Sequence, residues 1–335
     1  MPSITLDTLV SRAALVVRQH ASQRDQDLLL AVLQYAPNEK GKANVANKIL
    51  HCGDAFKGPQ KEDSCHFAQL ADFFWRNIIV PVRVSGGKTP QPQSRTSCSG
   101  STSADAFRSP AGTEAVNALN SVMDAALRRD KHRCVISGKV DPETIASGLG
   151  ALTGTGFEVS RVAHIIPFSL RNSVGYSSSS ASASASAAHL PSIWCALECF
   201  GGISLANLMH AGINSLDNVI TLSATLHRYF TALQVALEPI PDVPNTYKVL
   251  TWGKVAPRLG LSKTVKLFTP TDVPLPNPAY LALHAAICKL VWASARAEEL
   301  TAVLDDLEEV TLLAEDGSSA NLINIAIYRS LAAEA

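Results

Sequence analysis

Three side chains, His164, Asn218 and His227, have types and spacing that could support hydrolytic chemistry. His164 lies in VAHIIPF, where β-branched and aromatic neighbours predict a short strand that Pro167 ends. Asn218 lies in the turn SLDN before the apolar run VITL, and His227 follows nine positions later in SATLHRYF. Ser223 can cap that last segment as a helix. The predicted order is a strand with His, a loop, a strand with Asn and a helix with His.

This order suits metal-assisted hydrolysis of a phosphodiester. A neutral imidazole on the first strand can take a proton from water and direct that water at phosphorus. A divalent ion opposite it can stabilise the charge on the scissile phosphate and the leaving oxygen. Mg²⁺ keeps several waters and needs only one or two protein ligands. In this scheme Asn218 orients the base or offers its carbonyl to the metal, and His227 closes the metal site.

The segment before this set is predicted to be mainly helical. Apolar residues at 3-4 spacing indicate helices over residues 3–84, and the run IIVPVRV near their end is a candidate strand. Residues 85–112 are rich in Ser, Pro and Gly and poor in large apolar side chains, which predicts a linker. A helical module that packs on the later part of the chain is the simplest interpretation.

The rest of the chain alternates helices with short strands. An amphipathic helix is expected over 114–133, and the run SSSSASASASAA at 177–188 is expected to be a disordered loop within a domain. A helix around IWCALECF follows, residues 233–259 alternate as a hairpin does, and residues 278–314 look helical, with a last helix at about 319–334.

At this point the sequence resembles the HNH nuclease domain found in many fungal proteins, a member of the ββα-metal superfamily. The segments RDKHRCVISG, VAHIIPF, GINSLDNVITLSATLH and PAYLALHAAICKLVWASARAEE carry the resemblance, which spans roughly residues 114–299. The resemblance implies His164 as general base, Asn218 as an orienting or metal-contacting residue, and His227 as a metal ligand. It also implies Mg²⁺ or a similar ion such as Mn²⁺.

The sequence departs from that family pattern at two places. Many HNH proteins have an acidic metal ligand just before the first His, but Ala163 stands there, so Asp217, Glu158 or a distant residue would have to supply it. Many also hold a structural zinc with two C-x2-C pairs. A single thiol cannot make a tetrahedral site, so no structural zinc is predicted. The matching positions are Cys134, Ser137, Ser223 and Leu226.

Basic side chains near this set are candidates for phosphate contacts. Arg228 stands beside His227, where it could bind phosphate or be a solvated helix residue. The cluster RRDKHR could contact a nucleic-acid backbone, or it could complement the dipole at a helix end. Its candidate residues are Arg128, Arg129, Lys131 and Arg133. His164, Asn218 and His227 could themselves be packing or turn residues.

The composition excludes some classes of protein. The 335 residues carry 29 basic and 29 acidic side chains, so a uniformly basic nucleic-acid binder is excluded. Residues 297–335 hold nine acidic side chains and one basic one, a net charge of −8, which leaves +8 on residues 1–296. No membrane span or secretory signal is evident. Seven cysteines without framework spacing favour an intracellular protein, cytoplasmic or nuclear.

Together these observations predict an α+β protein with an HNH-like ββα-metal core embedded in helices. The expected division is a helical N-terminal module at 1–84, the linker at 85–112, the nuclease-like domain at 113–299 with an insert at about 175–189, and an acidic helical segment at 300–335. The predicted function is a divalent-metal-dependent endonuclease acting on nucleic acid, with double-stranded DNA as the first expected partner and no membrane. The alternative is a catalytically weak or inactive HNH-derived module that binds DNA or protein. The oligomeric state, the sequence specificity and the choice between DNA and RNA do not follow from the sequence.

Overall fold

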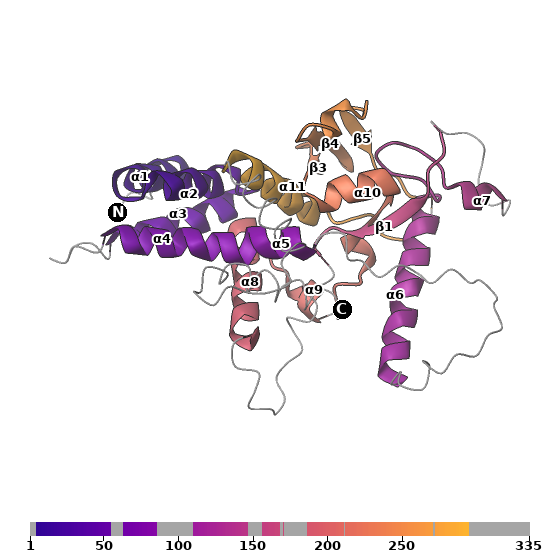
Figure 1. Ribbon diagram of the computed structural model, residues 1–335, viewed down its shortest axis with the longest axis horizontal. Helices are drawn as coiled ribbons and strands as arrows, with labels where there is room; N and C mark the ends of the chain where they lie inside the picture. The colour runs from indigo at the N-terminus through magenta and orange to yellow at the C-terminus, as the bar shows by residue number, and fades with distance from the viewer. Residues whose placement is uncertain are drawn as a thin grey trace, which may run out of the picture.

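The computed structural model describes residues 5–54, 63–85, 110–146, 156–167, 170, 186–210, 212–270 and 272–294 (Figure 1). Most of the predicted linker, most of the Ser/Ala run and the acidic C-terminal segment therefore lie outside the described residues. Within the described part of the chain, no helix combines the length and apolar character needed to cross a membrane.

The N-terminal part is helical, as predicted. Its elements are α1 (Leu6–His20), α2 (Gln23–Tyr35), α3 (Glu39–Asp54), α4 (Asp63–Phe74), a π-helical turn η2 (Trp75–Ile79) and α5 (Val80–Ser85). The side chains of Thr5 and Ser22 cap α1 and α2 by accepting hydrogen bonds from Thr8 N and Asp25 N.

The predicted strand at IIVPVRV is wrong, because this run forms the end of η2 and all but the last residue of α5. Pro81 is the second residue of α5, which directly follows the π-helical turn, so its missing backbone N–H interrupts the hydrogen-bond pattern of a continuous helical run. The apolar residues Ile78, Ile79 and Val80 are all buried. A continuous apolar run suits a helix buried on several sides as well as a strand, and only the packing distinguishes the two.

The N-terminal helices pack on elements that follow much later in the chain. These later helices are α8 (Ser186–Gly201), which lies against α3 and η2, and α11 (Pro278–Ala293), which lies against α2 (Figure 1). Asn38 donates a 2.6 Å hydrogen bond to the carbonyl of Gly201, and Asn44 donates one of 3.2 Å to that of Cys199. Gly41 has no room for a side chain, because an added Cβ would lie 2.3 Å from the Phe200 carbonyl oxygen. These contacts bring the N-terminal helices and the described helices and strands of the second half of the chain into one hydrophobic core.

The predicted strand, strand and helix around His164 are confirmed. Strand β1 (Ser160–His164) pairs antiparallel with β2 (Val219–Ser223), and α10 (Ala224–Thr231) follows β2 directly. The register places His164 opposite Val219 and Ser160 opposite Ser223. Ser223 caps α10 by accepting the Leu226 N–H, as expected. A short 3-10 turn, η5 (Leu216–Asn218), leads into β2.

A second small sheet completes the α+β fold. The predicted hairpin is present as β3 (Val235–Pro239) and β4 (Thr246–Thr251), and β5 (Thr264–Lys266) extends it. β3 packs against α11. The remaining elements are α6 (Pro110–Arg129), α7 (Pro142–Ala146), α9 (Ala206–His210) and the 3-10 turn η6 (Ala256–Arg258).

Arg129, the last residue of α6, is completely buried and joins four segments of the chain. Its guanidinium donates two 2.8 Å bonds to the carboxylate of Asp130 and further bonds to the carbonyls of Leu216, Val219 and Pro274. The same carboxylate accepts the N–H of Thr221 in β2 at 3.0 Å. The expected phosphate contact through Arg129 is therefore wrong, and the predicted helix over 114–133 ends at Arg129.

Replacing Arg129 should destabilise the fold strongly. Arg129→Met leaves the buried Asp130 carboxylate without its counter-charge and three carbonyls without a donor, so we expect a loss of about 3–5 kcal/mol in the free energy of unfolding. The neighbouring Arg128→Met, at an exposed position, should change it by less than about 0.5 kcal/mol. Urea unfolding followed by circular dichroism measures both, and equal stability of the two variants would contradict the role given to Arg129.

Candidate active site

His164 ends β1 and is almost fully buried, with 5% of its surface exposed. Its Nε2 lies 3.0 Å from the side-chain oxygen of Asn214. Because an amide oxygen only accepts, this bond places the ring proton on Nε2. Burial lowers the pKa of His164 to about 4 against the opposing effect of the Asn214 bond, and the neighbouring His227 lowers it further. His164 is thus a neutral, oriented imidazole at pH 7, which is the state that a general base requires.

Asn218 holds the loop that follows His164. It is fully buried, its Oδ1 accepts the N–H of Ile166 at 2.9 Å, and its Nδ2 donates to the carbonyls of Ile166 and Ile213. The backbone of Asn218 also accepts the N–H of Ile165. The amide has no surface to offer an ion, so the expected metal contact through Asn218 is wrong, and its geometry is that of a positioning residue.

His227 lies on α10 and turns into the same region as His164. Its side chain is 6% exposed, and its Nε2 has no hydrogen-bond partner among the described residues. Burial lowers the pKa of His227 to about 4, and the positive charge of Arg161 in β1 contributes in the same direction. His227 therefore interacts electrostatically with His164 and, separately, with Arg161 of β1.

A buried imidazole nitrogen without a partner suits a metal ligand, because such a group is costly unless something binds it. The carboxylates that could complete a metal site are used elsewhere. Glu158 accepts the Thr225 N–H at 2.7 Å and pairs with Lys139, which with the Thr225 bond lowers the pKa of Glu158 to about 2 despite burial. Asp217 accepts a short hydrogen bond from Ser215. No group of three His, Cys, Asp or Glu side chains suited to a metal occurs in the ranges described.

The four positions that carry structural zinc in many HNH domains form hydrogen-bonded turns here. Cys134 is buried, and its sulfur accepts the N–H of Ser137 at 3.3 Å. Ser223 accepts the N–H of Leu226 at 3.4 Å. Each of these hydrogen bonds closes a turn between residues three positions apart.

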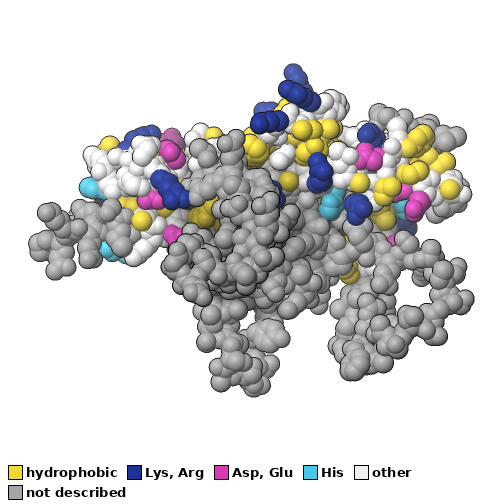
Figure 2. Space-filling view, in the orientation of Figure 1, with side chains coloured by type: hydrophobic (Ala, Val, Ile, Leu, Met, Phe, Trp, Pro, Cys, Tyr) yellow, Lys and Arg dark blue, Asp and Glu magenta, His cyan; other side chains and the backbone are white. Residues whose placement is uncertain are grey.

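The other predicted phosphate contacts are spread over the surface. Arg228 is exposed and leans on Tyr229, with its guanidinium carbon 5.3 Å from the ring centre. Arg128 and Lys131 are exposed, Lys131 lies 5.5 Å from the ring centre of Phe268, and Arg133 is half-buried. On the face shown in Figure 2, several Lys and Arg side chains lie over the β3–β5 sheet and α10.

Two residues that interact with the histidines, Asn214 and Arg161, are not predicted from the sequence. Asn214 stands four positions before Asn218 in INSLDN, so a second amide in the same loop was the available signal. Arg161 precedes His164 by three positions in β1, and nothing in that spacing shows that it faces His227. Both depend on how the loop and helix fold back on the strands.

A low pKa alone does not identify a catalytic histidine in this protein. His284 on α11 is 3% exposed, and its ring stacks on Phe230 at a centroid distance of 3.9 Å. Burial lowers the pKa of His284 to about 4 as well, although a bond with the Phe230 backbone raises it. The surroundings of His284 are those of a core residue. His164 and His227 differ from it because they interact with each other at the strand–strand–helix unit.

Comparison with known proteins finds a family match for part of this chain. Residues 134–238 match the family described as HNH endonuclease. This range contains β1, β2 and α10, and it includes Arg161, His164, Asn214, Asn218 and His227. It is shorter than residues 114–299, the span over which the sequence resembles an HNH domain. No curated protein and no solved structure matches the chain. The family description carries no distinction of a fungal branch.

The three buried histidines should make the protein acid-sensitive. Their pKa values are about 4 in the folded state and near 6.5 when exposed, so the unfolded chain binds more protons below pH 6.5. The contribution of these histidines to the free energy of unfolding is then fully present above about pH 6.5. It decreases as the pH falls toward 4, by at most about 1.4 kcal/mol per pH unit for each histidine.

Urea unfolding between pH 7 and pH 4.5 measures this dependence. His284→Phe should reduce the slope of the unfolding free energy against pH, because about one proton fewer is taken up on unfolding. His51→Gln, which changes an exposed histidine of α3, should leave the slope as it is. A stability independent of pH over this range would contradict the burial of these rings as neutral groups.

Proposed function

We propose that this chain hydrolyses phosphodiester bonds of nucleic acid, with His164 as the general base. The observation that carries the proposal is the neutral His164 ring, which Asn214 orients at the end of β1 and which interacts electrostatically with His227 of α10. The family match over residues 134–238 supports nuclease-type cleavage of nucleic acid for the same unit.

In this mechanism Nδ1 of His164, the ring nitrogen without a proton, accepts a proton from a water molecule as the water oxygen attacks phosphorus. The bond from phosphorus to the leaving oxygen then breaks, and that oxygen takes a proton from solvent. Arg161 carries a fixed positive charge close to His227, where it can stabilise the negative charge that develops on the phosphate. Asn214 and Asn218 act on the base and its loop and need not contact the substrate.

Nucleases of the HNH family generally use divalent metal ions. We propose His227 as the residue of this chain that would hold Mg²⁺ or Mn²⁺, because its Nε2 is buried and has no partner among the described residues. When bound, such an ion would stabilise charge on the scissile phosphate. Water and substrate oxygens would have to complete its coordination, as they commonly do for Mg²⁺.

The alternative function, a module that binds nucleic acid without cleaving it, has one specific observation in its favour. Within the described residues no cluster of three His, Cys, Asp or Glu side chains could hold a metal, and the positive charge of Arg161 acts on His227. The two functions differ in turnover and share the need to bind phosphate. Double-stranded DNA is the first substrate to test, and RNA is the second.

Plasmid nicking by the full chain tests the proposed nuclease activity. We expect cleavage in the presence of Mg²⁺ or Mn²⁺, and His164→Ala should lower the rate by about 10²–10⁴-fold because the water loses its base. His51→Ala, on an exposed face of α3, is the matched control and should cleave like the parent protein. Inactivity of the correctly folded parent on both plasmid and RNA, with either ion, would favour the binding module.

Arg161 should contribute to phosphate binding under either function. Arg161→Gln should weaken binding of a short DNA duplex and reduce the slope of log affinity against log salt by about 0.9, because one phosphate contact is lost. Arg12→Gln on α1 removes the same charge from an exposed position far along the chain and should leave the slope unchanged. Fluorescence anisotropy at several salt concentrations measures both, and identical slopes for the two variants would count against Arg161.

A further inference from the structure

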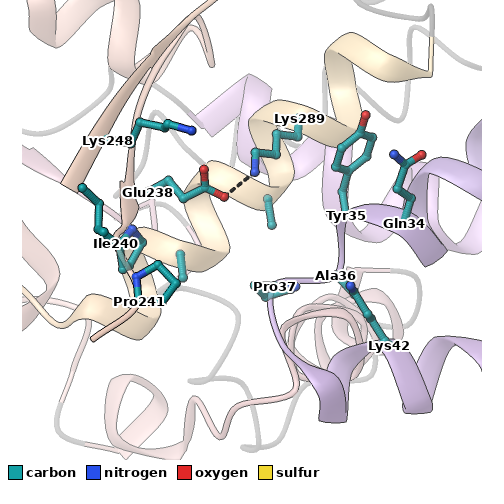
Figure 3. A pocket seen from close by; sticks show the side chains of 13 residues that line it. Gln34, Tyr35, Ala36, Pro37, Lys42, Glu238, Ile240, Pro241, Lys248 and Lys289 are labelled. Atoms are coloured by element: carbon teal, nitrogen blue, oxygen red, sulfur yellow. Dashed lines mark hydrogen bonds and ion pairs between the residues drawn. The ribbon is translucent and has the colours of Figure 1, made fainter. Parts of the chain in front are cut away.

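A cavity of about 540 Å³ lies between the N-terminal helices and the second sheet (Figure 3). One wall comes from the end of α2, the turn after it and α3, and the other comes from the β3–β4 hairpin and α11. Its size falls in the range of about 300–1,000 Å³ that small-molecule sites occupy. With the exception of Glu238, its lining lies outside the residues that match the nuclease family.

The cavity is lined by three lysines and one carboxylate. Glu238 forms an ion pair with Lys289 of α11, and it lies directly opposite Lys248 in the β3–β4 register. Lys42 comes from α3 on the other wall. Among the described residues, Lys42 and Lys248 make no ion pair, so the lining holds one carboxylate and three ammonium groups, a net charge of +2. This excess favours an anion with at least two negative charges.

Apolar surface separates the charged groups. Tyr35 and Pro37 stand on the helical wall, while Ile240 and Ala282 stand on the opposite wall. Figure 3 shows Glu238 and Lys289 meeting between the hairpin and the end of α2. A ligand that fits both kinds of surface has a flat or apolar body and an anionic end, and inorganic anions lack such a body.

We propose that this cavity binds a small organic polyphosphate, of the nucleoside diphosphate class, with its phosphates between Lys42, Lys248 and Lys289. The lysine ammonium is a compact point charge that binds phosphate oxygens. An anion with several charged oxygens can bridge lysines on opposed walls. The site is separate from His164 and does not depend on the proposed nuclease activity. Binding would connect α3 to the hairpin and stabilise the folded chain.

Isothermal titration calorimetry of the full chain with ADP, in metal-free buffer, tests the proposal. ADP should bind, whereas adenosine and pyrophosphate should each bind at least tenfold more weakly, since each offers only half of the recognised surface. Lys42→Gln and Lys248→Gln should each weaken ADP binding about tenfold, the value of one charge-assisted hydrogen bond. Ala282→Phe should abolish binding by filling the cavity, and an unchanged melting temperature without ligand shows that this variant is folded.

The control Lys254→Gln changes an exposed lysine outside the cavity and should bind ADP like the parent protein. Loss of ADP binding in Arg161→Gln but not in the cavity variants would place the nucleotide in the candidate active site and overturn the proposal. So would an equal effect of Lys254→Gln, equal affinity for pyrophosphate, or the absence of ADP binding.

Discussion

The buried pair of Arg129 and Asp130 is the constraint on which the geometry of the candidate site depends. A guanidinium with no exposed surface must have its donors satisfied inside the protein, and here they reach Asp130 and three carbonyls from two later segments of the chain. Two of these carbonyls, from Leu216 and Val219, flank Asn218 on both sides. The end of α6 therefore fixes the positions of η5 and β2. Asn218 in turn fixes the loop after His164 through its side-chain hydrogen bonds to the backbone of Ile166.

The electrostatics of the site follow from burial more than from charge pairing. Burial lowers the pKa of both His164 and His227, and the charge of Arg161 contributes to the lowering at His227. The result is a site with two neutral imidazoles and a positive charge near His227. Such a charge is favourable for a nearby anion and unfavourable for a nearby cation.

Polar satisfaction also explains how the fold closes its turns. In two of the turns, Cys134 and Ser223 accept hydrogen bonds from backbone groups three residues ahead. Elsewhere, Asn38 and Asn44 bind carbonyls at the end of α8 and seat the N-terminal helices on the second half of the chain. Short side chains at turn positions can replace a metal or a longer linker, because a buried backbone donor needs only one acceptor.

The sequence alone determined the elements whose signals are local. The strand before Pro167, the Ser223 cap of α10 and the alternating hairpin each depend on residues a few positions apart, and each is present. The run IIVPVRV failed because an apolar stretch looks alike in a strand and in a buried helix. Tertiary structure alone decided that Arg129 is a core residue, that Asn218 positions a loop, and that Asn214 and Arg161 join the two histidines. Those roles rest on partners up to 145 positions away, and the type of a residue does not specify which distant atoms will surround it.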